Sequence, residues 1–191
     1  WHPATPAPAP KPAVKTRFRD VPTHAAFYAE IEWLASRKIT TGYGDGTFRP
    51  DQSVERGAMA AYFYRMAGSP AVNLPKTSPF SDVPTNHPFY KEIVWMHQRG
   101  ITTGYGDGTF RPNEAVSREA TAAFLYRYNG SPVIPVVRSS GFKDVRANNS
   151  FYREIIWLES RKITAGYGDG TFRPYDSVSR GAMAAFLYRM R

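Results

Sequence analysis

Residues Gly42 to Pro50 read Gly-Tyr-Gly-Asp-Gly-Thr-Phe-Arg-Pro, and the same nine residues return unchanged at 104–112 and 166–174. Both intervals are 62 residues long, so one structural unit is used three times along the chain. Three glycines within five positions permit positive φ, and Asp-Gly favours a turn, so the nonapeptide predicts a tight loop. We expect Phe48 to anchor this loop in the core, with Tyr43 half-buried beside it.

Two ligand-binding interpretations of the loop have little support in its residues. A phosphate-binding loop needs Lys followed by Ser or Thr after the glycines. A calcium-binding loop needs several alternating acids, whereas each copy has one Asp. The prediction is a structural turn, and the alternative is that some of its backbone amides face a ligand. The candidate ligand contacts in the loop are Gly44, Gly106, Gly168, Asp45, Asp107 and Asp169.

The composition is that of a folded domain with acidic partners. Hydrophobic residues make up 42% and aromatic residues 15% of 191 residues, which is enough to build a core. The chain has no cysteine, which excludes disulfides and thiolate metal sites. No apolar run approaches the roughly 18 residues of a membrane span, so no membrane insertion is predicted. The net charge of +9 favours anionic glycans, teichoic-type polymers or nucleic acid, without choosing among them.

The first residues differ in composition from the rest. Pro and Ala alternate from Pro3 to Pro12, which predicts an extended, semi-rigid spacer, and we assign residues 1–16 to this linker. A linker at the start, without an initiator Met, indicates a carboxy-terminal module fused to an N-terminal functional domain.

Each repeat begins with Phe-x-Asp-Val, followed by a predicted helix. The Asp of this motif is expected to bind backbone amides. The predicted first helices cover His24 to Lys38, Asn86 to Arg99 and Asn148 to Lys162. In the first of them Phe27, Ile31 and Leu34 fall at i, i+4 and i+7, which is one face of a helix. Asn86 and Asn148 are predicted amino caps.

A tryptophan recurs beside this apolar stripe in every repeat. The three residues are Trp33, Trp95 and Trp157. Each precedes the last member of the stripe by one position, so we expect it at the edge of the buried face and partly exposed. Core packing is the ordinary role of such a residue, and an exposed indole on which a sugar ring stacks is the alternative.

The second helix of each repeat is predicted to start at Arg56, Arg118 or Arg180, with Ser117 and Ser179 as amino caps. In the first repeat a poorer cap, Glu55, takes the place of Ser. Two helices per repeat bury one face each, and three nearly uniform repeats lack the atypical ends of an open solenoid. The sequence therefore predicts an all-α, closed, pseudo-threefold arrangement with similar grooves between adjacent units.

These features together resemble the S-layer homology (SLH) domain family, in a set of three repeats. The repeats are placed at residues 17–70, 79–132 and 141–191. The resemblance implies an all-helical pseudo-trimer whose first helices form a central three-helix bundle. It also implies an extracellular, non-catalytic module without cofactor or metal, monomeric as a fragment. Such modules anchor surface proteins to bacterial cell-wall glycopolymers, often pyruvylated, or to peptidoglycan-linked polysaccharide.

The resemblance also points to the arginines. In the family the second helix commonly begins Thr-Arg-Ala-Glu, and the Arg contacts the acidic glycan. The Arg is kept here in all three repeats, whereas Ala58, Ala120 and Ala182 replace the Glu. Guanidinium binds a carboxylate with two parallel hydrogen bonds, and a helix amino terminus adds positive potential. The alternative is a surface ion pair with Asp or Glu. Glu55 beside Arg56 predicts weaker binding in the first groove.

Other classes of function fit less well. The four histidines do not recur through the repeats, so no His-based catalytic or metal site is indicated. Basic residues are spread over all repeats and no nucleic-acid reader motif is present, so nucleic-acid binding is not expected. Self-association into a surface lattice stays open beside anchoring.

Overall fold

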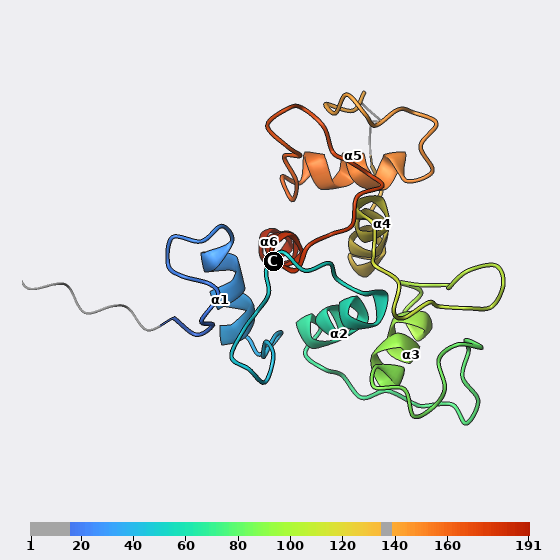
Figure 1. Ribbon diagram of the computed structural model, residues 1–191. Helices are drawn as coiled ribbons and strands as arrows, with labels where there is room; N and C mark the ends of the chain where they lie inside the picture. The colour runs from blue at the N-terminus through green and yellow to red at the C-terminus, as the bar shows by residue number, and fades with distance from the viewer. Residues whose placement is uncertain (1–15, 135–138) are drawn as a thin grey trace, which may run out of the picture.

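The computed structural model describes residues 16–134 and 139–191, so the spacer predicted over Pro3–Pro12 lies outside the described residues. The described ranges contain six α-helices, two from each repeat (Figure 1). The helices are α1 (Tyr28–Ser36), α2 (Arg56–Met66), α3 (Tyr90–Gln98), α4 (Arg118–Tyr128), α5 (Tyr152–Ser160) and α6 (Arg180–Met190). The predicted all-α class is confirmed.

Neighbouring repeats interleave. Helix α3 packs against α2, α5 packs against α4, and α1 packs against α6. Each first helix therefore lies on the second helix of the preceding repeat, and the contact between α1 and α6 closes the ring. This confirms the predicted closed pseudo-threefold assembly.

The helices around the centre are the second helices, so the expected central bundle of first helices is wrong. In Figure 1, α2, α4 and α6 surround the middle of the molecule, and α1, α3 and α5 lie outside them. Eight of the eleven residues of α2 are buried, compared with three of the nine in α1. A helix buried on most of its circumference belongs in the interior, whereas a helix with one apolar stripe belongs at the surface.

Three valines just before the second helices join the repeats in a ring. The Val54 amide donates to the Val178 carbonyl (2.9 Å), the Val178 amide to the Val116 carbonyl (3.0 Å), and the Val116 amide to the Val54 carbonyl (2.9 Å). All three side chains are buried. Buried backbone groups need partners, and here each repeat supplies the partner for another repeat.

The caps of the second helices follow the sequence prediction. The Ser117 and Ser179 hydroxyls accept the Ala120 and Ala182 amides at 3.2 and 3.1 Å, whereas Glu55 makes no side-chain cap.

The first helices begin later than predicted. Their amino caps are Phe27, Phe89 and Phe151, so the caps predicted at Asn86 and Asn148 are wrong. In the second and third repeats, the side chains of His87 and Asn149 accept the amides of these phenylalanines instead.

The Phe-x-Asp-Val motif holds the glycine loop of its own repeat. Asp82 accepts the amides of Phe110 (2.8 Å) and Arg111 (2.7 Å) through its two carboxylate oxygens. The ring of Phe110 is fully buried and lies 5.4 Å from that of Phe80. The predicted role of the Asp is confirmed, although the bound amides lie 28 and 29 residues further along the chain.

A substitution at Gly104 tests this attachment. Gly104 has a φ of 72°, and a Cβ there would meet the Phe80 ring and lie 2.7 Å from the Thr109 carbonyl. We expect Gly104→Ala to lower the free energy of unfolding in urea by at least about 1–3 kcal/mol, the cost of a strained backbone. The control is Gly106→Ala, where a Cβ would meet nothing within 4 Å. Equal losses in both variants would contradict this account.

Candidate functional site

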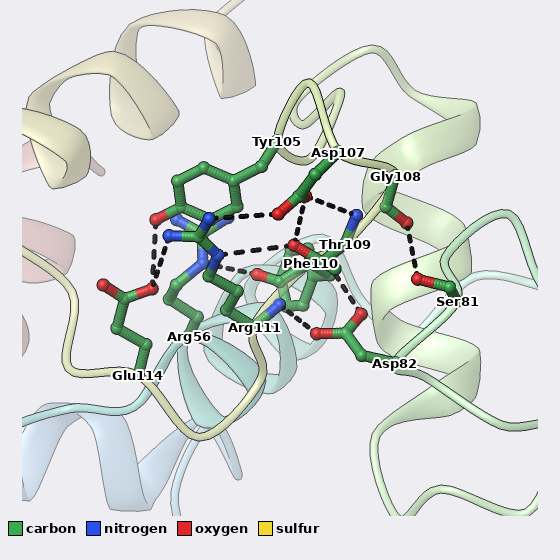
Figure 2. A network of polar contacts seen from close by, with 10 residues as sticks. All are labelled: Arg56, Ser81, Asp82, Tyr105, Asp107, Gly108, Thr109, Phe110, Arg111 and Glu114. Carbon is green, nitrogen blue, oxygen red and sulfur yellow. Dashed lines mark hydrogen bonds and ion pairs between the residues drawn. The ribbon is translucent and has the colours of Figure 1, made fainter.

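The arginine at the start of each second helix reaches into the glycine loop of the following repeat. The Arg56 Nε donates to the Phe110 carbonyl at 2.7 Å (Figure 2), and the third repeat returns to the first through Arg180 and Phe48, also at 2.7 Å. The Arg118 Nε donates to the Phe172 carbonyl at 2.6 Å. All three arginines are buried, with 5–8% of their surface exposed.

Aromatic rings surround each guanidinium. The central carbon of Arg180 lies 4.8 Å from the ring centre of Tyr43, 4.6 Å from that of Phe48 and 5.8 Å from that of Tyr62. The equivalent rings surround Arg56 and Arg118. Burial lowers the pKa of Arg56 and Arg118, but a guanidinium stays charged at any ordinary pH. Cation–π attraction offsets part of the cost of burial.

Among the described residues, none of the three buried guanidinium groups has an acidic partner. Throughout residues 16–134 and 139–191, no ion pair and no hydrogen bond engages the Nη atoms of Arg56, Arg118 or Arg180. The alternative of a surface ion pair with Asp or Glu is therefore wrong. Each arginine uses Nε for the structure and leaves its two Nη atoms unbonded.

The backbone amides beside Arg118 are already occupied. The Arg118 and Glu119 amides donate to the Asp176 and Pro174 carbonyls of the next repeat, both at 2.9 Å. The Ser117 hydroxyl takes the next amide along the helix. The expected contribution of the helix amino terminus is thus limited to its field, and the free donors at the site belong to the guanidinium.

The loop aspartates act within their own loops. Asp107 Oδ1 accepts the amide (3.0 Å) and the hydroxyl (2.6 Å) of Thr109, and Oδ2 pairs with Arg111 at 3.2 Å (Figure 2). The Arg111 guanidinium in turn covers the Tyr105 ring at 3.8 Å. Hydrogen bonds to Thr and Arg lower the pKa of all three loop aspartates, Asp45, Asp107 and Asp169, from 3.8 to about 2.

The three candidate glycines of the loops lie at the surface of the protein. Gly44, Gly106 and Gly168 are exposed, with open space beside them.

The expected exposure of the tryptophans is wrong for two of them. Trp95 and Trp157 are only 5% and 6% exposed, because Tyr64 and Tyr126 of the preceding repeats pack edge-on against their indoles. Trp33 is half-buried against Tyr188.

A cavity of about 210 Å³ adjoins Arg180 and is lined by all three repeats. Its walls include Tyr43, Tyr62 and Thr40 of the first repeat and Phe89 of the second. Among the described residues, no group makes a hydrogen bond of good geometry with the buried Tyr62 hydroxyl. Burial raises the pKa of Tyr62, whereas the charge of Arg180 and a weak hydrogen-bonding contact with the Thr40 hydroxyl lower it.

Sequence reasoning did not single out Tyr62. The signal was present, because Phe124 and Phe186 occupy the same position in the other two repeats. A hydroxyl that only one of three otherwise similar grooves contains is a candidate contact for a ligand.

Two negative findings concern the described part of the chain. It contains no group of three or more His, Asp or Glu residues that could hold a metal ion. None of its helices is both long and apolar enough to cross a membrane.

The S-layer homology domain model matches residues 17–60, 79–122 and 141–184, which is more than half of the chain. The chain belongs to the S-layer homology family. The SLH chain is 28% identical to Cell surface glycoprotein 1 of Acetivibrio thermocellus over 162 residues, covering 80% of this chain and 7% of the relative. It is 27% identical to the Cellulosome-anchoring protein of the same organism over 158 residues, covering 78% of this chain and 34% of the relative.

An S-layer protein of Bacillus licheniformis is 29% identical to the SLH chain over 182 residues, covering 94% of this chain and 20% of the relative. The chain thus spans between 7% and 34% of the length of these relatives. Membership of this family makes it a module of cell-surface proteins.

The SLH loops carry a pH-dependent contribution to stability. A carboxyl whose pKa falls from 3.8 to about 2 on folding stabilises the protein fully above about pH 4, and this contribution is lost as the pH falls toward 2. We expect the Asp107 carboxyl carbon to titrate near pH 2 by NMR, and Thr109→Ala to move the midpoint upward. Thr103→Ala, outside this network, is the control. A wild-type midpoint near 4 would show that the loop bonds are not formed in solution.

Proposed function

We propose that this chain holds the larger protein to which it belongs on the bacterial cell surface by binding an acidic cell-wall glycopolymer, without catalysis. The observation that carries the proposal is the set of three buried arginines whose Nη atoms have no partner in the described residues. The net charge of +9 and the names of the surface-anchoring relatives agree with it.

The energetics favour a ligand that carries a carboxylate. Burying an unpaired charge costs several kcal/mol. The carbonyl contact and the aromatic rings offset only part of this cost. A ligand carboxylate would accept hydrogen bonds from both Nη atoms, and such charge-assisted bonds are about twice as strong as neutral ones. A sugar bearing a carboxylate, such as a pyruvylated sugar, satisfies this requirement.

The groove at Arg180 is the strongest candidate of the three. It combines the unbonded Nη atoms with a cavity and the buried Tyr62 hydroxyl. Glu55 precedes Arg56 in the sequence, and its charge would oppose an anion in the first groove. Several grooves that engage one polymer would increase retention through effective concentration. Gly44, Gly106 and Gly168 stay candidate contacts, because they are exposed.

Self-association into a surface lattice is the second candidate, supported by the relative that is named an S-layer protein. Nucleic acid fits poorly, because the three arginines are buried singly between repeats and do not form an exposed stripe that follows a phosphate backbone.

Retention on purified cell-wall sacculi tests the arginine site. We expect native sacculi to retain the wild-type chain and polymer-stripped sacculi to release it. Arg118→Ala and Arg180→Ala should each weaken binding by about 2–5 kcal/mol at the affected groove, and the double variant should lose retention. Arg153→Ala, an exposed arginine on α5, is the control.

Two further measurements separate binding from folding in this series. Circular dichroism must show unchanged helicity in each variant, and added polymer must raise the melting temperature of the wild type but not of the double variant. Full retention of a folded double variant would assign the arginines to structure alone. Retention by stripped sacculi would point to peptidoglycan itself.

Tyr62→Phe tests the hydroxyl in the Arg180 groove. A buried hydroxyl without a partner costs about 1–3 kcal/mol, so we expect this variant to be as stable as the wild type or more stable, and to bind the polymer roughly tenfold more weakly. Tyr64→Phe is the control on the same helix, because the Tyr64 hydroxyl donates to the Pro70 carbonyl at 2.7 Å.

The two variants should have opposite effects on stability and on affinity for the polymer. Tyr64→Phe should lose about 0.5–1.5 kcal/mol of stability and keep its affinity. A destabilised Tyr62→Phe with unchanged retention would show that the Tyr62 hydroxyl is structural.

A further inference from the structure

A larger cavity, of about 550 Å³, lies where α2, α3 and α4 end. Its walls include Ala67, Trp95, Arg99, Arg127 and Tyr128, and it shares no lining residue with the Arg180 cavity. Its volume lies within the range of about 300–1,000 Å³ that is typical of small-molecule sites. We infer that this cavity is a second ligand site, separate from the arginine grooves, for a sugar that carries an anionic group.

The charge of the cavity favours an anion. Arg99 and Arg127 line it, and none of the described residues that line it is acidic. Arg127 is half-buried, and one of its Nη atoms donates to the Ile101 carbonyl at 3.4 Å. Arg99 is exposed, and within the described ranges no hydrogen bond or ion pair engages its guanidinium. Arg99 also lies at the carboxyl end of α3, where the helix dipole stabilises a cation without using its donors.

The remaining walls suit a sugar. Trp95 is a buried residue that lines the cavity, and the half-buried Tyr128 ring lies 6.4 Å from it. Burial raises the pKa of the Tyr128 hydroxyl and the nearby Arg99 opposes that rise. The Gln98 Nε2 donates to the Asn73 carbonyl at 2.7 Å, which fixes the side chain and leaves its oxygen as an acceptor for a sugar hydroxyl. Apolar rings with a few fixed polar groups are typical of small-molecule sites.

One position of the repeat differs at the wall of this cavity. The position is Ala67 in the first repeat, and the open cavity lies beside it. Its second copy, Asn129, bonds to the Leu125 carbonyl and the Met190 sulfur, and the cavity there measures about 240 Å³. Its third copy, Arg191, places its guanidinium over the rings of Trp33 (5.6 Å) and Tyr188 (3.5 Å).

Arg191 therefore occupies the space beside Trp33, whereas in the first copy the equivalent space beside Trp95 is a cavity. The smaller cavity repeats the positive charge, since Arg161, Lys162 and Arg189 line it and no acid does. That the sugar belongs to an acidic wall polymer depends on the proposed function. The existence of the site depends only on the cavity and its lining residues.

NMR titration of the full chain tests the site. The signals to follow are the Trp95 indole and the Gln98 side-chain amide. The probes are glucuronate and glucose 1-phosphate, which distinguish a carboxylate from a phosphate ligand, with glucose and inorganic phosphate as comparisons. We expect saturable shifts with at least one anionic sugar, at concentrations at least tenfold lower than glucose or inorganic phosphate requires.

Two variants should remove this binding. Ala67→Arg places in the cavity the residue found at the third copy, and Arg99→Gln removes the free guanidinium. Each variant should weaken binding of the anionic sugar at least tenfold. Arg37→Gln changes the equivalent residue of the first repeat, where Arg191 covers Trp33, and should have no effect. The absence of saturable shifts, equal binding of inorganic phosphate, or full binding by Ala67→Arg would overturn the proposal.

The two proposals fail separately. Loss of sacculus retention in the Arg118 and Arg180 variants would test only the arginine grooves. These variants should still bind the anionic sugars at the cavity. Binding of the sugars without any sacculus retention would remove the anchoring proposal and leave the cavity site in place.

Discussion

The structure depends on donors at the start of each second helix that only another repeat satisfies. The amides of Arg118 and Glu119 and the Arg118 Nε all bond to carbonyls of the next repeat, and the valine ring at 54, 116 and 178 joins the same segments. Unsatisfied buried donors are costly. A single repeat would leave these donors without partners, so the three repeats fold as one closed unit.

The same constraint creates the candidate site. Closing the ring brings each arginine against the glycine loop of its neighbour. There one guanidinium nitrogen completes the structure, and the other two have no hydrogen bond within the part of the chain that the structure describes. Structural and binding roles therefore share a side chain. The loop that receives the arginine is itself rigid, because the Asp of one motif and the Asp, Thr and Arg of the nonapeptide hold its backbone.

Departures from the threefold repeat give the grooves and cavities their differences. Tyr62 stands where the other repeats have Phe, and Ala67 stands where they have Asn and Arg. Each change accompanies a difference in one space: Tyr62 places a buried hydroxyl near Arg180, and Ala67 lines the cavity beside Trp95. Near-identical repeats can thus present unequal binding surfaces without a change of fold.

The sequence by itself determined the threefold repeat, the all-helical class, the serine caps and the buried Phe48, because these features follow from local turn chemistry and from a pattern that recurs. It also indicated the closed ring, since no repeat is an atypical end. Only the tertiary structure decided that second helices lie at the centre, that Trp95 and Trp157 are covered, and what Arg56 contacts. A period of 62 residues does not say whether a helix packs within its own repeat or on its neighbour, and each of these outcomes depends on that choice.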